Sequence, residues 1–335
     1  MKELMNYTLI CAVALLLLAG CGKKGCDIPA EITNLPVNIA IEQLEKPFFK
    51  LETREQIVQF LDAHPQFSEK YLNRSRYPHD SVLVNVLYKL VSSKDMDQLV
   101  EATDKKFGKA EDLEQDLELA FKHIKHYYPQ FAVPKVQTFI SGFANDITVT
   151  DSLLVISLEN FIGPGAPYRP DYPQYILNRY KPDYIVPTAV LAYSNQFNKT
   201  DFLNKSLMAE MVYYGKAYYF TSKMLPCTPD SVLMGYTDQN IADLYYNQDK
   251  IWAHFIEHNL LYETSHFKVN KYIGERPTTQ EIGSKAPGRI GRWVGLQIVR
   301  AYMENHPDVT LQQLMAEKDP QKIFSQSGYK PKRPS

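Results

Sequence analysis

Hydrophobic positions recur at helical spacing in residues 201–220. Three or four residues separate the members of one apolar row, which is formed by Leu203, Leu207, Met211, Tyr214 and Tyr218. This spacing predicts one amphipathic α-helix, because positions three and four apart share a helix face. Asp201 or Thr200 is expected to cap its N-terminus with a side-chain oxygen. The remaining elements are expected to pack around this helix.

One acid, Glu210, falls within that apolar row. It lies three residues after Leu207 and four before Tyr214, so both are its neighbours on the helix surface. A carboxylate at such a position is either buried with a partner or lines a cavity. Four phenols are close in sequence: Tyr213, Tyr214, Tyr218 and Tyr219. We expect hydroxyl or backbone groups to hydrogen-bond Glu210 in a pocket lined by tyrosine, and both a structural and a chemical role stay open.

Helical periodicity also fills most of residues 50–128. Thr53 is the expected N-cap of a helix that ends before Pro65. Further apolar rows predict three helices, over 81–91, 96–107 and 113–128. Acids occupy the first turn of the last one, where they complement the helix dipole. Residues 50–128 are therefore predicted to be an almost entirely helical block.

The pattern changes to that of strands after Pro129. Apolar residues predict short strands at 37–41, 136–141, 147–149 and 153–158, the last two joined by a tight turn. After a loop rich in Gly and Pro, helices are predicted at 238–261 and 291–303, the second packed closely through Gly291 and Gly295. Thr310 is expected to begin a last helix. The predicted fold class is α+β, mostly helical, with a short β-hairpin or sheet.

The first residues predict a lipoprotein signal. One lysine precedes an apolar run from Leu9 to Leu18, which is too short for a committed transmembrane span. Leu18-Ala19-Gly20-Cys21 then resembles a bacterial lipobox, which implies cleavage before Cys21 and lipid on its sulfur and new N-terminus. Several acyl chains would anchor the protein firmly, whereas one alone is marginal.

Composition and charge narrow the possible functions. The formal net charge of −1 provides no general field to attract nucleic acid, so no nucleic acid is expected as a partner. A hydrophobic content of 44% and 23 tyrosines fit a packed globular protein. Cys26 and Cys227 remain once the signal is removed and Cys21 carries lipid. An oxidising compartment permits a bridge between them, and the sequence leaves that pairing open.

One stretch matches a zinc-binding pattern. His254-Phe255-Ile256-Glu257-His258 follows His-x-x-Glu-His, in which two histidines meet one ion and the acid polarises water. Acids that would complete such a site are available at Glu263, Glu275, Glu281 and Glu304. The competing interpretation is that both histidines are ordinary helix-surface residues. No zinc cofactor is expected, and a metal site formed by His254 and His258 is the alternative.

Two arginines mark a candidate anion site. Arg289 and Arg292 flank Gly291 at the start of the helix predicted over 291–303. Guanidinium groups near a helix N-terminus favour a carboxylate. Salt bridges to acids of the same domain are the competing interpretation. The candidate residues for binding a ligand or partner are thus Glu210, Tyr213, Tyr214, Tyr218, Arg289 and Arg292.

Several stretches together resemble one protein family. Besides the lipobox, they are MVYYGKAYYF at 211–220, LP-x-x-x-D at 225–230, GYTDQ at 235–239, NQDKIWAHFIEHNLLYET at 247–264, PGRIGRWVGLQIVRAYM at 287–303 and SGYKPK at 327–332. They are similar to the gliding-motility lipoprotein B (GldB) family of Bacteroidetes. The resemblance covers most of residues 150–332 and weakens before them. It implies a palmitate-type lipoprotein of the cell envelope, linked to gliding and to type IX secretion.

The resemblance also implies a zincin-like body. The family is similar to zinc peptidases of the gluzincin type, in which one helix carries His-Glu-x-x-His. Laid on residues 209–213, this motif places Glu210 at the acid position, but Ala209 and Tyr213 at the two ligand positions. Gln248 also stands where relatives carry an acid. The resemblance therefore implies a former metal-binding helix that has kept its carboxylate.

These inferences define four regions and one preferred function. A signal peptide at 1–20 and a tether at 21–36 precede a mainly helical region at 37–130 and a zincin-like α+β domain at 131–332. We expect a lipoprotein of the outer membrane that faces the periplasm and acts through other motility or secretion proteins. Neither Glu210 nor Glu257 is expected to be catalytic. The alternatives are a membrane-tethered zinc metallopeptidase and a periplasmic ligand-binding or chaperone lipoprotein.

Overall fold

The computed structural model describes residues 26–331 and divides into two compact units after Asn34. The described part of the first unit contains the short helix α2 (Ala30–Thr33), which lies within the expected tether. The second unit begins at Leu35 and contains every other described helix and strand. The expected signal peptide and Cys21 lie outside the described residues.

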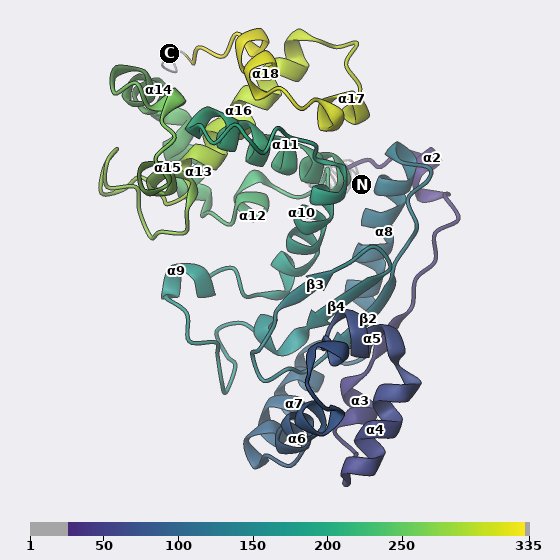
Figure 1. Cartoon of the computed structure of the whole chain (residues 1–335). Helices are drawn as coiled ribbons and strands as arrows, with labels where there is room; N and C mark the ends of the chain where they lie inside the picture. The colour runs from purple at the N-terminus through teal and green to yellow at the C-terminus, as the bar shows by residue number, and fades with distance from the viewer. Residues whose placement is uncertain (1–25, 332–335) are drawn as a thin grey trace, which may run out of the picture. The chain divides into compact units, whose positions relative to one another are not determined.

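A mixed four-stranded sheet forms part of the second unit (Figure 1). Its strands are β1 (Ile41–Gln43), β2 (Lys135–Phe139), β3 (Ile147–Val149) and β4 (Leu153–Ser157), in the order β1-β2-β4-β3. The first three of these neighbours run parallel, and β3 is an antiparallel edge strand. The predicted hairpin of the last two strands is therefore confirmed. The strand predicted at 37–41 is wrong in its bounds, because pairing with β2 begins only at Ile41.

Helices connect β1 to its parallel neighbour β2. They are α3 (Glu45–Phe48), α4 (Arg54–Ala63), α5 (Pro65–Lys70), α6 (Asp80–Val91), α7 (Lys94–Phe107) and α8 (Glu111–Tyr127), with a 3-10 turn η2 (Arg74–Arg76). Thr53 caps α4 as predicted, and its hydroxyl accepts a hydrogen bond from the Gln56 amide at 3.2 Å. The helical block predicted over 50–128 is thus confirmed. The domain boundary expected at residue 130 falls between α8 and β2, inside the second unit.

Helices also dominate the chain after β4. They are α9 (Gln174–Leu177), α10 (Ile185–Phe197), α11 (Leu207–Met224), α12 (Asp230–Met234), α13 (Asp238–Tyr246), α14 (Gln248–Glu257), α15 (His266–Ile273), α16 (Ile290–Asn305), α17 (Leu311–Ala316) and α18 (Pro320–Ser327). Three 3-10 turns accompany them: η3 (Leu158–Phe161), η4 (Pro182–Tyr184) and η5 (Leu260–Tyr262). Thr310 caps α17 as predicted, but α17 is not the last helix, because α18 follows it. A mostly helical α+β fold is therefore confirmed.

The sheet separates two apolar clusters, since successive side chains of a strand point to opposite faces. Leu153 and Val155 of β4 belong to a cluster formed mainly with α3–α6. Leu154 and Ile156 belong to the larger cluster that includes side chains of α8, α10, α11 and α16. All five residues of β4 are buried, as expected for a strand covered on both faces.

The long helices α11 and α16 cross at two glycines. A Cβ at Gly295 would lie 1.8 Å from the Met211 carbonyl oxygen, and one at Gly215 would lie 2.2 Å from the Gly295 oxygen. Only residues without side chains permit this backbone approach. Gly291 makes a similar close contact, because a Cβ there would lie 2.9 Å from Ile273. Close packing through Gly291 and Gly295 is thus confirmed, with Gly295 against the central helix α11 and Gly291 against α15.

The central helix α11 begins later than its apolar pattern predicts. Its N-cap is Ser206, whose hydroxyl accepts a hydrogen bond from the Ala209 amide at 3.2 Å. Leu203, expected on the apolar face, is 91% exposed in the preceding loop. The Asp201 carboxylate closes a local turn there, accepting a hydrogen bond from the Leu203 amide at 2.9 Å. These short polar side chains compete with helical hydrogen bonding and delay the helix.

Two further elements differ from the predictions. The helix predicted at 238–261 is divided, because Asn247 ends α13 and begins α14. The proline-interrupted sequence does not predict α10, yet Pro187 lies in its first turn, where the missing amide donor has little cost. α10 contacts both β3 and α11, so it joins the β3–β4 hairpin to the central helix (Figure 1).

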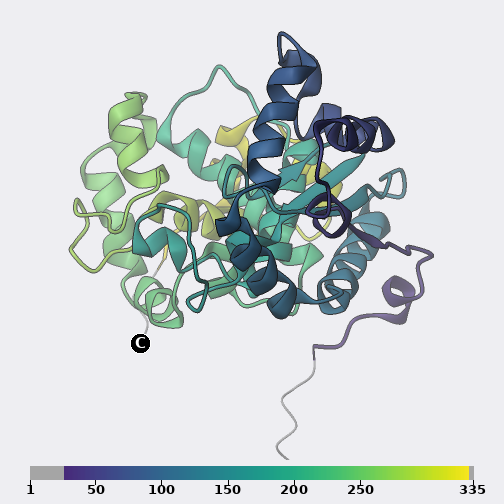
Figure 2. The ribbon, with the colours of Figure 1, turned by 90° about the horizontal axis from the view of Figure 1, so that it is seen from below.

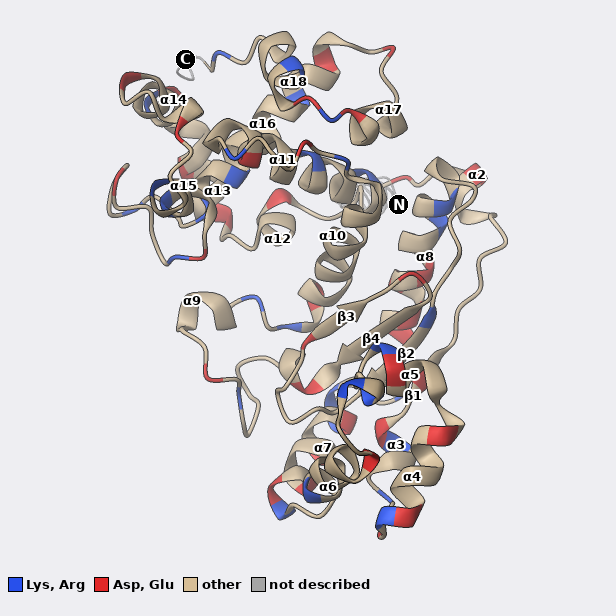
Figure 3. Cartoon of the chain, viewed as in Figure 1, with Lys and Arg blue, Asp and Glu red and all other residues tan. Residues whose placement is uncertain are grey.

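Two groups of helices in the second unit lie apart from each other. In both perpendicular views, the green helices α13–α15 are separate from the purple helices α3–α5 (Figures 1 and 2). Basic and acidic positions are interspersed along the helices, in agreement with the low net charge (Figure 3). None of the helices within residues 26–331 combines the length and hydrophobicity that crossing a membrane requires.

Candidate functional site

Glu210 lies on a part of α11 that solvent reaches. Glu210, Tyr213 and Tyr214 are three and four residues apart, and all three are half-buried. Within residues 26–331, the Glu210 carboxylate makes no hydrogen bond and no ion pair. The expectation that hydroxyl or backbone groups hold it in a tyrosine pocket is therefore wrong. Partial exposure explains the difference, because water can solvate a carboxylate that the protein leaves without partners.

The α11 side chains at the ligand positions of a zincin helix do not suit zinc. Ala209 offers no donor atom, and the Tyr213 hydroxyl donates a hydrogen bond to Asn195 Oδ1 at 2.8 Å. Burial raises the pKa of Tyr213, and the neighbouring Tyr214 and Glu210 add to the shift. A zinc site needs at least three protein ligands. This donor set does not fit the metal.

The second zinc pattern lies at the end of α14. His254 Nε2 is 2.9 Å from the Tyr272 hydroxyl oxygen, and burial together with His258 lowers the pKa of His254. α14 ends at Glu257, so His258 follows the helix, and both Glu257 and His258 are exposed. The two imidazole centroids are 4.6 Å apart. The described residues contain no group of three or more His, Cys, Asp or Glu side chains that could hold a metal ion.

Three of the candidate residues come together in a different place. Tyr218, Arg289 and Arg292 line one pocket of about 340 Å³. α11 supplies Tyr218, and the first turn of α16 with its N-cap supplies the two arginines. The other walls come from the η3–α10 segment, from α12 and from the loop after α15. We describe this cavity below as the arginine pocket.

Arg289 forms the floor of the arginine pocket. It is 5% exposed, and its backbone adopts φ 61°, which turns the chain into α16. Its Nη2 donates to the Met234 carbonyl oxygen at 2.9 Å, and its Nε lies 3.6 Å from Glu275 Oε2. Burial opposes the charge, but Tyr218, Tyr236 and Glu275 outweigh it and raise the pKa of Arg289. Arg289 is therefore a buried, permanently charged cation.

Arg179 and Glu275 form an ion pair that also lines the arginine pocket. Both terminal nitrogens of Arg179 donate to the Glu275 carboxylate, at 3.1 and 2.9 Å, which is a bidentate arrangement. Burial acts against the charge of Glu275, yet Arg289 and Arg179 hold the pKa of this carboxyl below its usual range. Gly235 permits the approach, because a Cβ there would lie 2.3 Å from Arg179 Cδ. Its φ of 66° also favours glycine.

Two contacts hold the Arg292 side chain in place, one through its Nε and one through the face of its guanidinium group. Its Nε donates to the Ile273 carbonyl oxygen at 2.8 Å. Its guanidinium carbon lies 4.2 Å from the ring centroid of Tyr214, a cation–π distance. Among the described residues, neither terminal nitrogen of Arg292 has a hydrogen-bond partner or a carboxylate within ion-pair distance, although the charge of Arg292 helps to lower the pKa of Glu275. The predicted residues Tyr214 and Arg292 are thus brought together.

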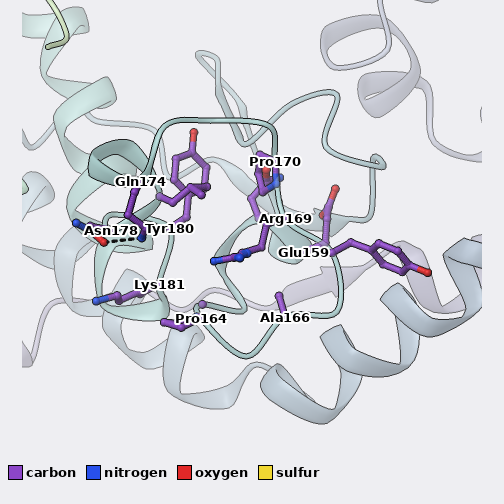
Figure 4. A pocket seen from close by; sticks show the side chains of 13 residues that line it. Glu159, Pro164, Ala166, Arg169, Pro170, Gln174, Asn178, Tyr180 and Lys181 are labelled. Atoms are coloured by element: carbon purple, nitrogen blue, oxygen red, sulfur yellow. Dashed lines mark hydrogen bonds between the residues drawn. The ribbon is translucent and has the colours of Figure 1, made fainter. Parts of the chain in front are cut away.

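A smaller pocket of about 60 Å³ shares Tyr180 with the arginine pocket (Figure 4). The Tyr180 hydroxyl donates to Asp146 Oδ2 at 3.0 Å, and burial and Asp146 raise the pKa of Tyr180. Glu159 lines the smaller pocket and is 1% exposed. Its Oε1 accepts hydrogen bonds from the Ser141 amide and hydroxyl, both at 2.8 Å, and from the Phe143 amide at 3.2 Å.

Burial raises the pKa of Glu159 to about 7, although these hydrogen bonds favour the charged form. Glu159 Oε2 is buried without a partner among the described residues. The loop that Glu159 holds contains two successive positive φ angles, at Gly142 and Phe143. Glu159 therefore ties the loop after β2 to the end of β4.

The sequence identifies only part of the arginine pocket. Arg289 and Arg292 stand out because they lie at a predicted helix start. Arg179 carries no sequence signal, and Glu275, which lies 96 residues away from it, attracts notice only as an available acid. Gly235 begins the GYTDQ stretch, which is the one signal that points to this wall.

Comparisons with known proteins agree with the sequence motifs. A family model described as gliding motility protein GldB matches residues 25–331, which is most of the chain. No curated protein and no solved structure matches significantly. Because the family model spans both the helical connection and the arginine pocket, the match does not rest on one motif. The chain belongs to the family of gliding motility protein GldB.

Proposed function

We propose that this protein is a lipid-anchored protein of the cell envelope that supports gliding motility and type IX secretion. The single observation that carries the proposal is the family match over residues 25–331. The Leu-Ala-Gly-Cys sequence before and at Cys21 supports a lipid anchor, with palmitate-type acyl chains on this residue. We place the protein in the outer membrane. The periplasmic face is favoured because Gly-Lys-Lys-Gly follows Cys21, without the acidic cluster that resembles a surface-export tag.

The protein acts as a non-catalytic scaffold with a zincin-like body. The side chains at the ligand positions of α11 support this part of the proposal, because Ala209 has no donor and Tyr213 donates its hydroxyl to Asn195. Its partners are other envelope proteins of motility or secretion. A lipid anchor places the scaffold beside them and raises their effective concentration.

A second candidate is a ligand-binding or chaperone lipoprotein, which the arginine pocket favours. Its volume of about 340 Å³ lies within the range of small-molecule sites. The two candidates differ in what the purified protein retains, because a scaffold captures envelope proteins and a carrier captures a small molecule.

Deletion of the gene in its own bacterium tests the proposal. We expect non-spreading colonies and loss of secreted type IX cargo, both restored by the wild-type chain. Affinity purification of a tagged chain from solubilised envelope should recover other motility or secretion proteins. Normal spreading and secretion in the deletion strain would remove the proposed role.

A further inference from the structure

The arginine pocket carries one positive charge in excess. Its charged lining residues are three arginines, Arg179, Arg289 and Arg292, and two acids, Asp146 and Glu275. Glu275 is shared between Arg179 and Arg289. Asp146 accepts hydrogen bonds from the Tyr180 hydroxyl at 3.0 Å and from the Ile147 amide at 2.6 Å. Glu275 also feels the charge of Arg292, but no lining carboxylate lies within ion-pair distance of the Arg292 guanidinium.

Some guanidinium nitrogens of the arginine pocket have no hydrogen-bond acceptor among the described residues. Both terminal nitrogens of Arg292 lack a partner within residues 26–331, while its Nε contact with Ile273 keeps the side chain in place. Arg179 Nε is a buried donor without an acceptor. A buried unsatisfied donor carries a desolvation cost that an incoming oxygen removes. The donors are planar guanidinium groups, which suit the two oxygens of a carboxylate.

Most of the remaining lining of the arginine pocket is apolar or aromatic. Phe161 stacks on Tyr180 with ring centroids 5.4 Å apart, and Tyr172 lies 5.7 Å from Tyr180. Ile176, Leu191 and Leu233 add aliphatic surface to the same cavity. A ligand that fills it therefore has an apolar body next to its anionic group. One excess positive charge matches a monoanion better than a dianionic phosphate.

We propose that the arginine pocket binds an apolar carboxylate, which Arg292 holds with its terminal nitrogens while Phe161, Tyr172 and Tyr180 cover the apolar part. The carboxylate end of a peptide with an apolar last residue and a free aromatic or aliphatic acid share this chemistry. The inference goes beyond the envelope role and does not depend on it, because binding is measured on purified protein.

Calorimetric titration of the full-length chain in mild detergent tests the inference. The probes are the peptide N-acetyl-Leu-Phe, its C-terminal amide, 3-phenylpropionate and inorganic phosphate. We expect saturable binding of at least one carboxylate probe, and binding of the amide at least about tenfold weaker, since a charge-assisted hydrogen bond is lost. Binding of the peptide alone identifies a peptide end as the source, and binding of 3-phenylpropionate identifies a free acid.

Matched variants separate the pocket from non-specific binding. Arg292→Gln should weaken the carboxylate probe about tenfold or more, while Arg76→Gln, which removes an exposed charge outside the pocket, should leave it unchanged. If Arg292→Gln does not fold, the difference in affinity between the peptide acid and its amide, measured on the wild type, still tests the inference. Equal binding of acid and amide, no saturable binding at millimolar concentration, tighter binding of phosphate, or an unchanged affinity in a folded Arg292→Gln would each overturn the inference.

Discussion

Glu159 is a buried residue whose pKa the fold shifts strongly. Its pKa is raised to about 7 by burial, from 4.5 in the unfolded chain, so the folded protein binds the proton more tightly. The stability that this contributes is fully present below pH 4.5 and is lost as the pH rises through about 7. The shift corresponds to about 3 kcal/mol at most.

The pH dependence of unfolding tests this account of Glu159. The free energy of unfolding, measured with denaturant at pH 5 and pH 8, should fall by up to about 3 kcal/mol more for the wild type than for Glu159→Gln. The glutamine has no proton to lose, so its contribution is flat across this window. Parallel pH profiles for the two proteins would show that Glu159 does not titrate between these values.

Glu210, unlike Glu159, is predicted to contribute little to stability, because the described residues leave its carboxylate without partners. Glu210→Gln should change the free energy of unfolding by less than about 0.5 kcal/mol, as is usual for a solvent-accessible position without special contacts. It should also restore spreading in the deletion strain. A folded Glu210→Gln protein that fails to restore spreading would assign chemistry to this carboxylate.

At the same scale, the sequence predicts side chains better than it predicts their partners. Tyr214, Tyr218, Arg289 and Arg292 are candidates from local pattern alone, and three of them line the arginine pocket. The bidentate contact of Arg179 with Glu275 joins residues 96 positions apart, so only the fold reveals it. Helical spacing predicts which face of α11 carries Glu210, but it does not predict how deeply that face is buried, so the predicted hydrogen-bond donors are absent among the described residues.

At the scale of elements, α11 and α16 cross closely, and both supply residues that line the arginine pocket. Gly295→Ala should lower the free energy of unfolding by about 3 kcal/mol or more, because its Cβ would lie 1.8 Å from the Met211 oxygen. Gly165→Ala is the matched control, with no atom within 4 Å of the added carbon. Denaturant midpoints with unchanged slopes measure both. Equal stability of the two variants would contradict the close crossing.

Local signals explain which elements were predictable. Thr53 and Thr310 cap helices as expected, since both also form capping boxes that the sequence displays. Pro187 obscures the helical pattern of α10 in the sequence, because proline usually ends a helix, but the first turn of a helix accommodates it. The apolar pattern predicts too early a start for α11. Leu203 fits the helical row, although it lies in an exposed loop.

At the scale of the whole molecule, the proposed scaffold role predicts that the purified chain does not hold zinc. Elemental analysis of the purified chain should find far less than one zinc per molecule. Ala209 cannot bind zinc, the Tyr213 hydroxyl donates to Asn195, and His258 follows the end of α14. One zinc per chain that is lost on His254→Ala would replace the scaffold with the metallopeptidase alternative.

The most direct test of the central claim compares wild type and Cys21→Ser in the deletion strain, with a clickable fatty acid, membrane fractionation and colony spreading read on the same cultures. A lipid-anchored motility protein predicts that Cys21→Ser loses the label, leaves the membrane fraction and fails to restore spreading at an equal protein level. Cys21→Ser protein that stays labelled, or that restores full spreading without label, would contradict the account.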